Sequence, residues 1–172
     1  GFLLALQTVD ALIRSGQVTT ALVIGSETLS KILDYTDRST AVLFGDGAGC
    51  FIVTTQKENK PWIHFVNTQG DTENTLSTDG IRLNATLRNI QNETPYLRMK
   101  GQAVFRFAVK AVEDAIKQIL IKSGKTLDEI DLIVPHQANA RILGHVADKM
   151  KFPMDKFVMN MDEFGNTSSA SI

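Results

Sequence analysis

The sequence alternates between segments with helical periodicity and short apolar runs, and no other feature limits the possible folds as strongly. Apolar residues recur at helical spacing over residues 2–13 and again over 104–120. Residues 21–25, 132–134 and 157–159 are short apolar runs, which is the pattern of strands buried on both faces. This alternation predicts an α/β fold with a mostly parallel or mixed sheet.

Weaker signals describe the segments between these elements. Residues 41–44 and 50–54 are apolar runs separated by a glycine-rich stretch, which predicts one bent strand or two strands joined by a tight turn. Thr126 and Glu129 have the spacing of a capping box, and Asn139 is suited to cap the helix that follows it.

The middle and the two ends of the chain carry less regular patterns. Residues 69–92 are rich in Thr and Asn, so a loop or insertion is expected there. Helical spacing begins at Phe2, and residues 165–172 form a turn that enters a helix of small residues. We therefore expect the chain to be an excerpt of a longer protein.

Charge and cysteine content exclude several classes of protein. The formal net charge of −1 gives no overall field that would favour nucleic acid or an anionic membrane. The apolar runs are far shorter than the roughly 20 residues of a membrane span, so membrane insertion is not expected. Cys50 is the only cysteine, which excludes an internal disulfide framework and fits a reducing compartment, with the cytoplasm as the default.

Two polar residues follow predicted strands and are candidates for chemistry. His136 comes directly after residues 132–134, and the carboxyl ends of strands are where open α/β sheets bind ligands. Asn166 lies in the turn before the last predicted helix, where its side chain could equally cap that helix. If both meet over one edge of the sheet, neutral His and Asn side chains can donate hydrogen bonds to an oxyanion.

The remaining candidates are expected to be structural. His64 lies in residues 62–66, which have strand-like spacing, and His145 lies on the helix after Asn139, at the surface or partly packed. Cys50 opens an apolar run and is expected to be buried and inert. The glycines of residues 45–49 lack the Lys and Ser or Thr of a phosphate loop, so backbone packing is expected to explain them.

Five stretches together resemble the β-ketoacyl-acyl-carrier-protein synthase III family, which starts bacterial type II fatty acid synthesis. In chain order they are GFLLAL, DRSTAVLFGDGAG, MKGQAVFRFAV, VPHQANARI and GNTSSASI. The resemblance covers the chain except residues 69–92 and implies a thiolase-like layered αβαβα fold, present here in part. Residues 1–56 would end the first thiolase-like half, and residues 57–172 would form most of the second half without its C-terminal strands.

The resemblance also implies a Cys-His-Asn triad, with His136 and Asn166 at the family's histidine and asparagine positions. The nucleophilic cysteine would lie just upstream of Gly1, and Cys50 matches a small apolar position instead. In the implied reaction, the cysteine takes an acyl group from acyl-CoA. Malonyl-acyl-carrier protein then loses carbon dioxide, and its enolate is stabilised by hydrogen bonds from His136 and Asn166. No cofactor or metal is implied, because the CoA thioester is a substrate.

Substrate-binding positions follow from the same resemblance. Arg38 matches the arginine that holds the adenine nucleotide end of CoA, although Ser39 stands where glycine is common. Gly101, Phe105 and Asn139 match residues along the pantetheine tunnel.

Acyl and carrier-protein contacts are implied in the same way. Phe44 and Leu97 match the wall of the acyl pocket, although apolar residues of this kind also serve as ordinary core. Arg106, Arg141 and Lys149 match basic positions where the acidic carrier protein docks. The family also implies a homodimer.

Three alternatives remain open from the sequence. A related condensing enzyme of secondary metabolism would share these motifs. If the residue upstream is not cysteine, His136 and Asn166 could support decarboxylation of a malonyl group without condensation. A fragment without catalytic activity could instead pack against a partner polypeptide.

Overall fold

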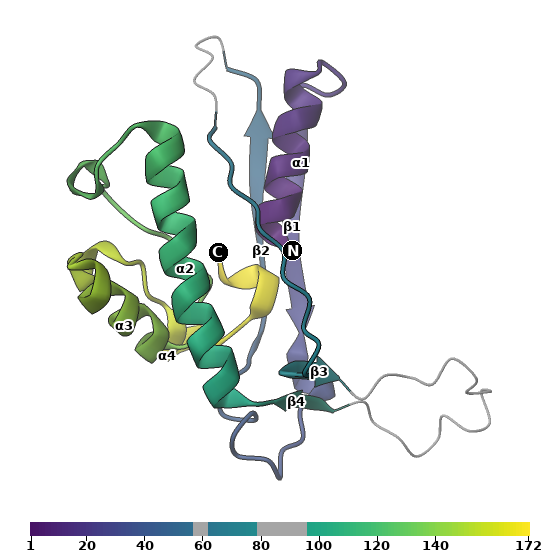
Figure 1. Cartoon of the computed structure of the whole chain (residues 1–172). Helices are drawn as coiled ribbons and strands as arrows, with labels where there is room; N and C mark the ends of the chain where they lie inside the picture. The colour runs from purple at the N-terminus through teal and green to yellow at the C-terminus, as the bar shows by residue number, and fades with distance from the viewer. Residues whose placement is uncertain (57–61, 79–95) are drawn as a thin grey trace, which may run out of the picture.

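The computed structural model describes residues 1–56, 62–78 and 96–172 (Figure 1). It begins with helix α1 (Phe2–Arg14), which is the predicted N-terminal helix. Strands β1 (Thr20–Thr28) and β2 (Asp46–Thr54) follow and pair antiparallel along their whole length. The 3-10 helix η1 (Leu29–Ile32) begins the connection between them.

The β1–β2 sheet is covered on one face and open on the other. Phe2 of α1 packs edge-on against Phe51, with ring centroids 5.1 Å apart, and Val23 opposite Phe51 is buried. Leu22 and Ile24 point to the other face and are 57% and 58% exposed. The prediction of a strand at residues 21–25 is confirmed, but burial on both faces is wrong because α1 covers only one of them.

The exposed face also corrects the expectation for the cysteine. Cys50 pairs with Ile24 in the antiparallel register, so its side chain lies on the same open face and is exposed rather than buried. Alternation along a strand places neighbouring residues on opposite faces, and the apolar run around Cys50 concealed this alternation.

Residues 41–44 do not form the predicted strand. Asp37 accepts hydrogen bonds from Ser39 and Thr40, and these bonds hold the chain in turns up to Leu43. Only Phe44 makes strand-like contact, in an isolated parallel bridge with Asn166.

The glycines that follow allow the close backbone packing that the sequence predicts. A Cβ atom at Gly45 would lie 2.3 Å from the carbonyl oxygen of Phe164. On the covered face of β1, a Cβ atom at Gly25 would lie 2.5 Å from the carbonyl oxygen of Ser169. The C-terminal segment therefore sits directly on the backbone of the first sheet.

The middle of the chain leads into the longest helix. Residues 69–75 have no regular structure, as expected, but β3 (Leu76–Thr78) pairs antiparallel with β4 (Leu97–Met99), which corrects the loop prediction at residues 76–78. The rest of the predicted loop, from residue 79 onward, lies outside the described residues. Helix α2 (Gly101–Ser123) then confirms the strongest helical prediction and ends at Gly124, whose φ of 66° is left-handed.

Helix α3 (Ala140–Met150) packs beside α2 (Figure 1), and the main apolar core lies between these helices and the segment that follows α3. The buried residues of this core are Val109, Ile142, Val146, Ala147, Phe152 and Phe157. The predicted capping box at Thr126 is confirmed before the 3-10 helix η3 (Leu127–Glu129). A second 3-10 helix, η4 (Met154–Lys156), follows α3.

The expected parallel strands are reduced to single contacts. Ile133 and Phe157 form an isolated parallel bridge, while Leu132 and Val134 are exposed. Pro135 has no N–H with which to extend the pairing. Among the described residues, both named sheets are antiparallel, so the prediction of a mostly parallel or mixed sheet is wrong at the level of continuous strands.

The chain closes with the short helix α4 (Met161–Phe164) and the 3-10 helix η5 (Ser168–Ser171). The sequence predicted a helix of small residues here, and the structure forms a single 3-10 segment. In the part of the chain that the structure describes, no helix is long and apolar enough to cross a membrane.

Candidate active site

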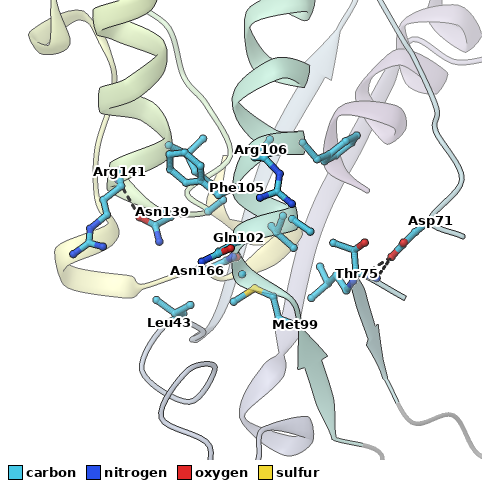
Figure 2. Close-up of a pocket in the computed structure, with 18 of the residues that line it drawn as sticks. Leu43, Asp71, Thr75, Met99, Gln102, Phe105, Arg106, Asn139, Arg141 and Asn166 are labelled. Carbon is cyan, nitrogen blue, oxygen red and sulfur yellow. Dashed lines mark hydrogen bonds between the residues drawn. The ribbon is translucent and has the colours of Figure 1, made fainter. Parts of the chain in front are cut away.

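A cavity of about 1380 Å³ lies beside the N-terminal half of α2 (Figure 2). Its wall is formed by the start of α2, residues 69–76, the loop before α3 and the turn around Asn166. Several of the predicted site residues line it together: His136, Asn166, Phe44, Gly101, Phe105, Asn139, Arg106 and Arg141. These residues come from four separate parts of the chain, so the fold brings them together as the motifs suggested.

Asn166 lines the cavity and is held there by backbone and side-chain hydrogen bonds. Its backbone N–H donates to the carbonyl of Leu43 at 2.8 Å, and its own carbonyl accepts from the N–H of Gly45 at 2.9 Å. Its side-chain Oδ1 accepts from the N–H of Ser168 at 2.9 Å. Because the oxygen is engaged in this turn, the Nδ2 amide is the donor that remains for the cavity.

Local capping and a role in the cavity are therefore compatible at Asn166. The sequence left these two interpretations as alternatives. In the structure, Oδ1 of Asn166 shapes the turn by accepting from Ser168, and Nδ2 is left for the cavity. Asn166 itself is only 7% exposed, while Figure 2 shows it between Gln102 of α2 and Leu43.

His136 lies at the end of the segment that bridges to Phe157. Its Nδ1 is 2.6 Å from Oγ of Ser171 in η5. Surrounding protein atoms lower the pKa of His136 below its ordinary value, because desolvation disfavours the imidazolium, although one side of the residue stays accessible. A backbone hydrogen bond with Ser168 opposes this effect.

Gln137 is a site-supporting residue that sequence reasoning missed. It is 1% exposed, and its amide donates to the carbonyls of Pro135 and Val158 at 3.0 and 2.9 Å. Its Oε1 accepts from the N–H of Asn160 at 3.1 Å. Gln137 thus ties the His136 segment to the neighbouring one, a role that depends on partners far away in sequence.

Asn139 and Phe105 lie on the helix side of the cavity. Oδ1 of Asn139 accepts from the N–H of Arg141 at 2.9 Å, which confirms its predicted capping of α3. Phe105 packs edge-on against the ring of His145, with centroids 5.8 Å apart. The pairing fits the structural interpretation of His145, which is exposed on α3.

The wall opposite α3 comes from a segment that sequence analysis treated as a loop of no known role. Asp71 accepts hydrogen bonds from the N–H groups of Thr75 and Leu76 at 2.7 and 3.1 Å. The backbone N–H of Lys100 donates to the carbonyl of Thr75 at 2.8 Å. Figure 2 shows Asp71 and Thr75 on the side of the cavity opposite Asn139. Aspartate before a short Thr-rich stretch is a turn signal that could have predicted this ordering.

Three predicted site residues lie outside the cavity lining. Leu97 is buried in β4, at 7% exposure. Arg38 is exposed in the turn beside Ser39, which does line the cavity. Lys149 lines a smaller neighbouring hollow together with Arg106.

Lys149 is bound in an ion pair across the two helices. Glu113 of α2 is 7% exposed and contacts Lys117 and Lys149, each at 2.5 Å. Hydrogen bonds from Lys117 and then Lys149 lower the pKa of Glu113 to about 2. Within the described residues, neither Arg106 nor Arg141 forms an ion pair, so these two arginines carry the unpaired positive charge at the cavity.

His64 has a structural partner. Its Nε2 lies 2.8 Å from the carboxylate of Asp10 on α1, and its carbonyl accepts from Nζ of Lys122 at 2.9 Å. These contacts tie the segment around His64 to both α1 and α2. The expected strand-like geometry is absent there, since the described residues 62–75 have no regular structure.

Two family models match the sequence. The model described as 3-oxoacyl-[acyl-carrier-protein (ACP)] synthase III matches residues 1–71, and its C-terminal counterpart matches residues 120–172. A β-ketoacyl-[acyl-carrier-protein] synthase III of Clostridium perfringens is 42% identical, over 100% of this chain and 54% of that protein. The same enzyme of Streptococcus uberis is 44% identical, over 100% of this chain and 53% of that protein. The chain thus spans about half the length of the curated relatives it matches.

Solved structures agree with the sequence matches. A 3-oxoacyl-(acyl carrier protein) synthase III of Pseudomonas aeruginosa superimposes with a TM-score of 0.87 at 36% identity, over 100% of this chain and 52% of that one. The priming β-ketosynthase of the R1128 polyketide pathway gives a TM-score of 0.81 at 32% identity, over 99% and 51%. These neighbours confirm the predicted layered α/β fold of the thiolase type, present in part.

Proposed function

Because the chain belongs to the 3-oxoacyl-[acyl-carrier-protein] synthase III family, we propose that it carries the histidine and asparagine part of the active site of a condensing enzyme. The observation that supports this most directly is the shared cavity of His136 and Asn166. Each side chain has one polar atom engaged by η5 or the turn before it, and each keeps another for a ligand.

The proposed reaction begins fatty acid synthesis. An acyl group passes from acyl-CoA to a cysteine, which the family resemblance places just before Gly1. Malonyl-acyl-carrier protein then loses carbon dioxide, and negative charge develops on its thioester oxygen. Nδ2 of Asn166 and the ring of His136 stabilise that oxygen by hydrogen bonds. The resulting carbanion attacks the acyl-cysteine to give the β-ketoacyl product.

The cavity suits the thioester arm of such substrates. Phe105 and Phe44 provide apolar surface, while Asn139 and Asn166 provide amide groups along it. Arg106 and Arg141 are exposed at the cavity and would meet the acidic carrier protein. Arg38 would hold the nucleotide end of CoA from the exposed turn. Lys149 would contribute less than the arginines, because Glu113 already pairs with it.

The remaining expectations are part of the same proposal. The reaction needs no resident cofactor or metal, since CoA enters and leaves as a substrate. Acyl-CoA and malonyl-acyl-carrier protein are the proposed partners, in a cytoplasmic homodimer. Leu97 is buried outside the cavity lining and would shape the acyl pocket through packing rather than contact.

A second candidate function is the priming of polyketide synthesis. The similarity to the R1128 priming β-ketosynthase, at 32% identity, favours it to some degree. The two functions differ in the carrier protein that supplies the malonyl group. Parallel assays with the carrier proteins of fatty acid and polyketide synthesis would therefore separate them.

The experiment that tests the proposed function measures condensation and decarboxylation by the full-length gene product with acetyl-CoA and malonyl-acyl-carrier protein. His136→Ala and Asn166→Ala should each slow decarboxylation about a hundredfold, because one oxyanion donor contributes on the order of 3 kcal/mol. His64→Ala is the matched control, since His64 pairs with Asp10 away from the cavity. Full decarboxylation by His136→Ala would contradict the proposal.

A further inference from the structure

The turn that carries Arg38 is built on the carboxylates of two aspartates. Oδ1 of Asp34 accepts hydrogen bonds from the N–H and the hydroxyl of Thr36 at 3.1 and 2.6 Å. Oδ1 of Asp37 accepts in the same way from Ser39, at 2.9 and 2.6 Å. Arg38 stands between Asp37 and Ser39 and is exposed, and Ser39 lines the cavity. The two carboxylates therefore fix the turn at the edge of the cavity.

The charge of this turn conflicts with the ligand proposed for it. Between residues 34 and 40 the chain carries two aspartates and one arginine, which is a formal charge of −1. The nucleotide end of CoA carries several negative phosphate charges, and like charges repel. Neither carboxylate can be replaced without loss of its hydrogen bonds to the turn. A turn that holds an anionic nucleotide therefore requires a further positive charge from another part of the chain.

Arg98 of β4 supplies this charge. Its Nη1 lies 3.2 Å from Oδ2 of Asp34. The guanidinium also lies over the ring of Tyr96, 5.4 Å from its centroid. Hydrogen bonds from Ser39 lower the pKa of Asp37 most, and the positive charge of Arg98 adds to that shift. Arg98 therefore acts on both carboxylates of the turn.

The strand that holds Arg98 also contributes to the cavity wall. Arg98 pairs with Ser77 in the register of β3 and β4. Its neighbours are Leu97, which is buried, and Met99, which lines the cavity. Alternation along the strand directs Arg98 to the face opposite both neighbours. The ion pair thus joins the turn to a strand that forms part of the cavity.

We propose that Arg98 is a positioning residue for the nucleotide end of CoA. It holds the turn of Arg38 against β4 and cancels the net negative charge that the turn would otherwise present to phosphate. This role rests on the proposed function, in which Arg38 holds the nucleotide. It concerns the nucleotide and not the thioester arm, which pantetheine shares with CoA.

Acyl transfer from acetyl-CoA and from acetyl-pantetheine by the full-length gene product tests this role. The two substrates share the thioester arm, and only acetyl-CoA has the nucleotide. The ratio of their kcat/KM values therefore reports the contacts of the nucleotide, because losses common to both substrates cancel.

Arg98→Gln should lower this ratio about two- to fivefold, which is the range expected of an exposed ion pair. The decrease should become smaller as ionic strength rises, because salt screens exposed charges. Arg98→Lys keeps the positive charge and should restore most of the ratio. An equal fall of kcat/KM with both substrates in Arg98→Gln would show a general structural role and would overturn the inference.

Arg14→Gln is the matched control, because Arg14 forms an ion pair of similar exposure with Asp10 on α1. It should leave the ratio unchanged. If Arg38→Ala lowers the ratio and Arg98→Gln does not, the inference is overturned and the proposed function stands. If the unaltered protein does not prefer acetyl-CoA to acetyl-pantetheine, the inference and the role of Arg38 both fail. Decarboxylation of malonyl-acyl-carrier protein then still decides the roles of His136 and Asn166.

Discussion

At the scale of single residues, Asn166 uses its two amide atoms for different tasks. Oδ1 accepts from Ser168 and shapes the turn, while Nδ2 is left for the cavity. Asn166→Asp should keep the turn and lose the donor, because a carboxylate accepts at both oxygens. We expect decarboxylation to fall at least a hundredfold with a small change in melting temperature. Calorimetry together with the decarboxylation assay measures both, and unchanged decarboxylation would exclude Nδ2 as a donor.

Gln137 illustrates a residue whose importance depends on distant partners. Gln137→Ala would remove hydrogen bonds from the buried carbonyl of Pro135 and from the half-buried carbonyl of Val158 and N–H of Asn160. We expect a loss of about 2–4 kcal/mol in the free energy of unfolding, measured with urea. Gln118→Ala on the exposed side of α2 is the control and should cost less than about 0.5 kcal/mol. Equal losses in the two variants would show that Gln137 is not a structural tie.

Residues with chemical roles are easier to predict from this sequence than the residues that support them. His136 and Asn166 stand in recognisable motifs, and the structure brings both to one cavity. Gln137 is adjacent to His136 in the same motif, but two of the partners of its side chain, Val158 and Asn160, lie 21 and 23 residues away. Cys50 was misplaced because an apolar run does not reveal which sheet face lacks a cover.

At the scale of elements, the ion pairs of Glu113 link α2 to α3. Hydrogen bonds from two lysines lower its folded-state pKa from 4.5 to about 2. A carboxyl with a depressed pKa stabilises the fold above its unfolded pKa, and this contribution is lost as pH falls through the folded value. Glu113→Gln should therefore reduce stability at neutral pH and flatten its decline between about pH 4.5 and pH 2.

Urea unfolding across this pH range measures the effect. Asp114→Asn is the control, since its carboxylate is half-exposed and 4.0 Å from Lys110. It should keep the steep decline of the unaltered protein. An equally steep decline in Glu113→Gln would show that the ion pairs of Glu113 do not contribute to the pH dependence of the free energy of unfolding.

The contact between η5 and the first sheet is a second test at this scale. Gly25→Ala places a Cβ atom 2.5 Å from the Ser169 carbonyl oxygen, so η5 must shift. We expect a loss of about 1–3 kcal/mol in the free energy of unfolding and slower decarboxylation. Gly49→Ala is the matched control, because its Cβ would meet Ala170 at an ordinary 3.7 Å. Equal free energies of unfolding and equal decarboxylation rates in the two variants would show that η5 can shift without cost.

Helices were predicted more accurately than strands, and the cause is physical. The periodicity that marks α2 is local, and the capping of α3 by Asn139 uses residues two positions apart. A strand depends on a partner elsewhere in the chain. Only one position pairs between residues 132–134 and 157–159. Residues 41–43 lie in the turns that begin at Asp37 instead of forming a strand.

At the scale of the whole molecule, one face of the β1–β2 sheet is apolar and uncovered. Leu22, Ile24 and Ile52 share that face, and Ile52 is 74% exposed. Uncovered apolar patches favour association. The chain of residues 1–172 expressed by itself should therefore self-associate, as measured by light scattering after size exclusion.

Replacing Leu22 and Ile52 by Thr should reduce this association, since Thr retains a preference for strands. Ile121→Thr changes an equally exposed residue on α2 and serves as the control. If the substitutions on the sheet leave association unchanged, another surface of the chain is responsible for it. The boundary between residues 1–56 and 57–172 stays a prediction, and light scattering of the full-length gene product tests the proposed homodimer.

The place of η5 on the first sheet also has a consequence for the order of events during protein synthesis. Ser169 meets Glu27 across 142 positions of sequence, and Asn166 bridges to Phe44. Contacts of such long range form late in folding. The cavity can therefore acquire Asn166, and His136 its contact with Ser171, only after the ribosome has passed residue 171. Until then the nascent chain lacks the assembled cavity and would not catalyse decarboxylation.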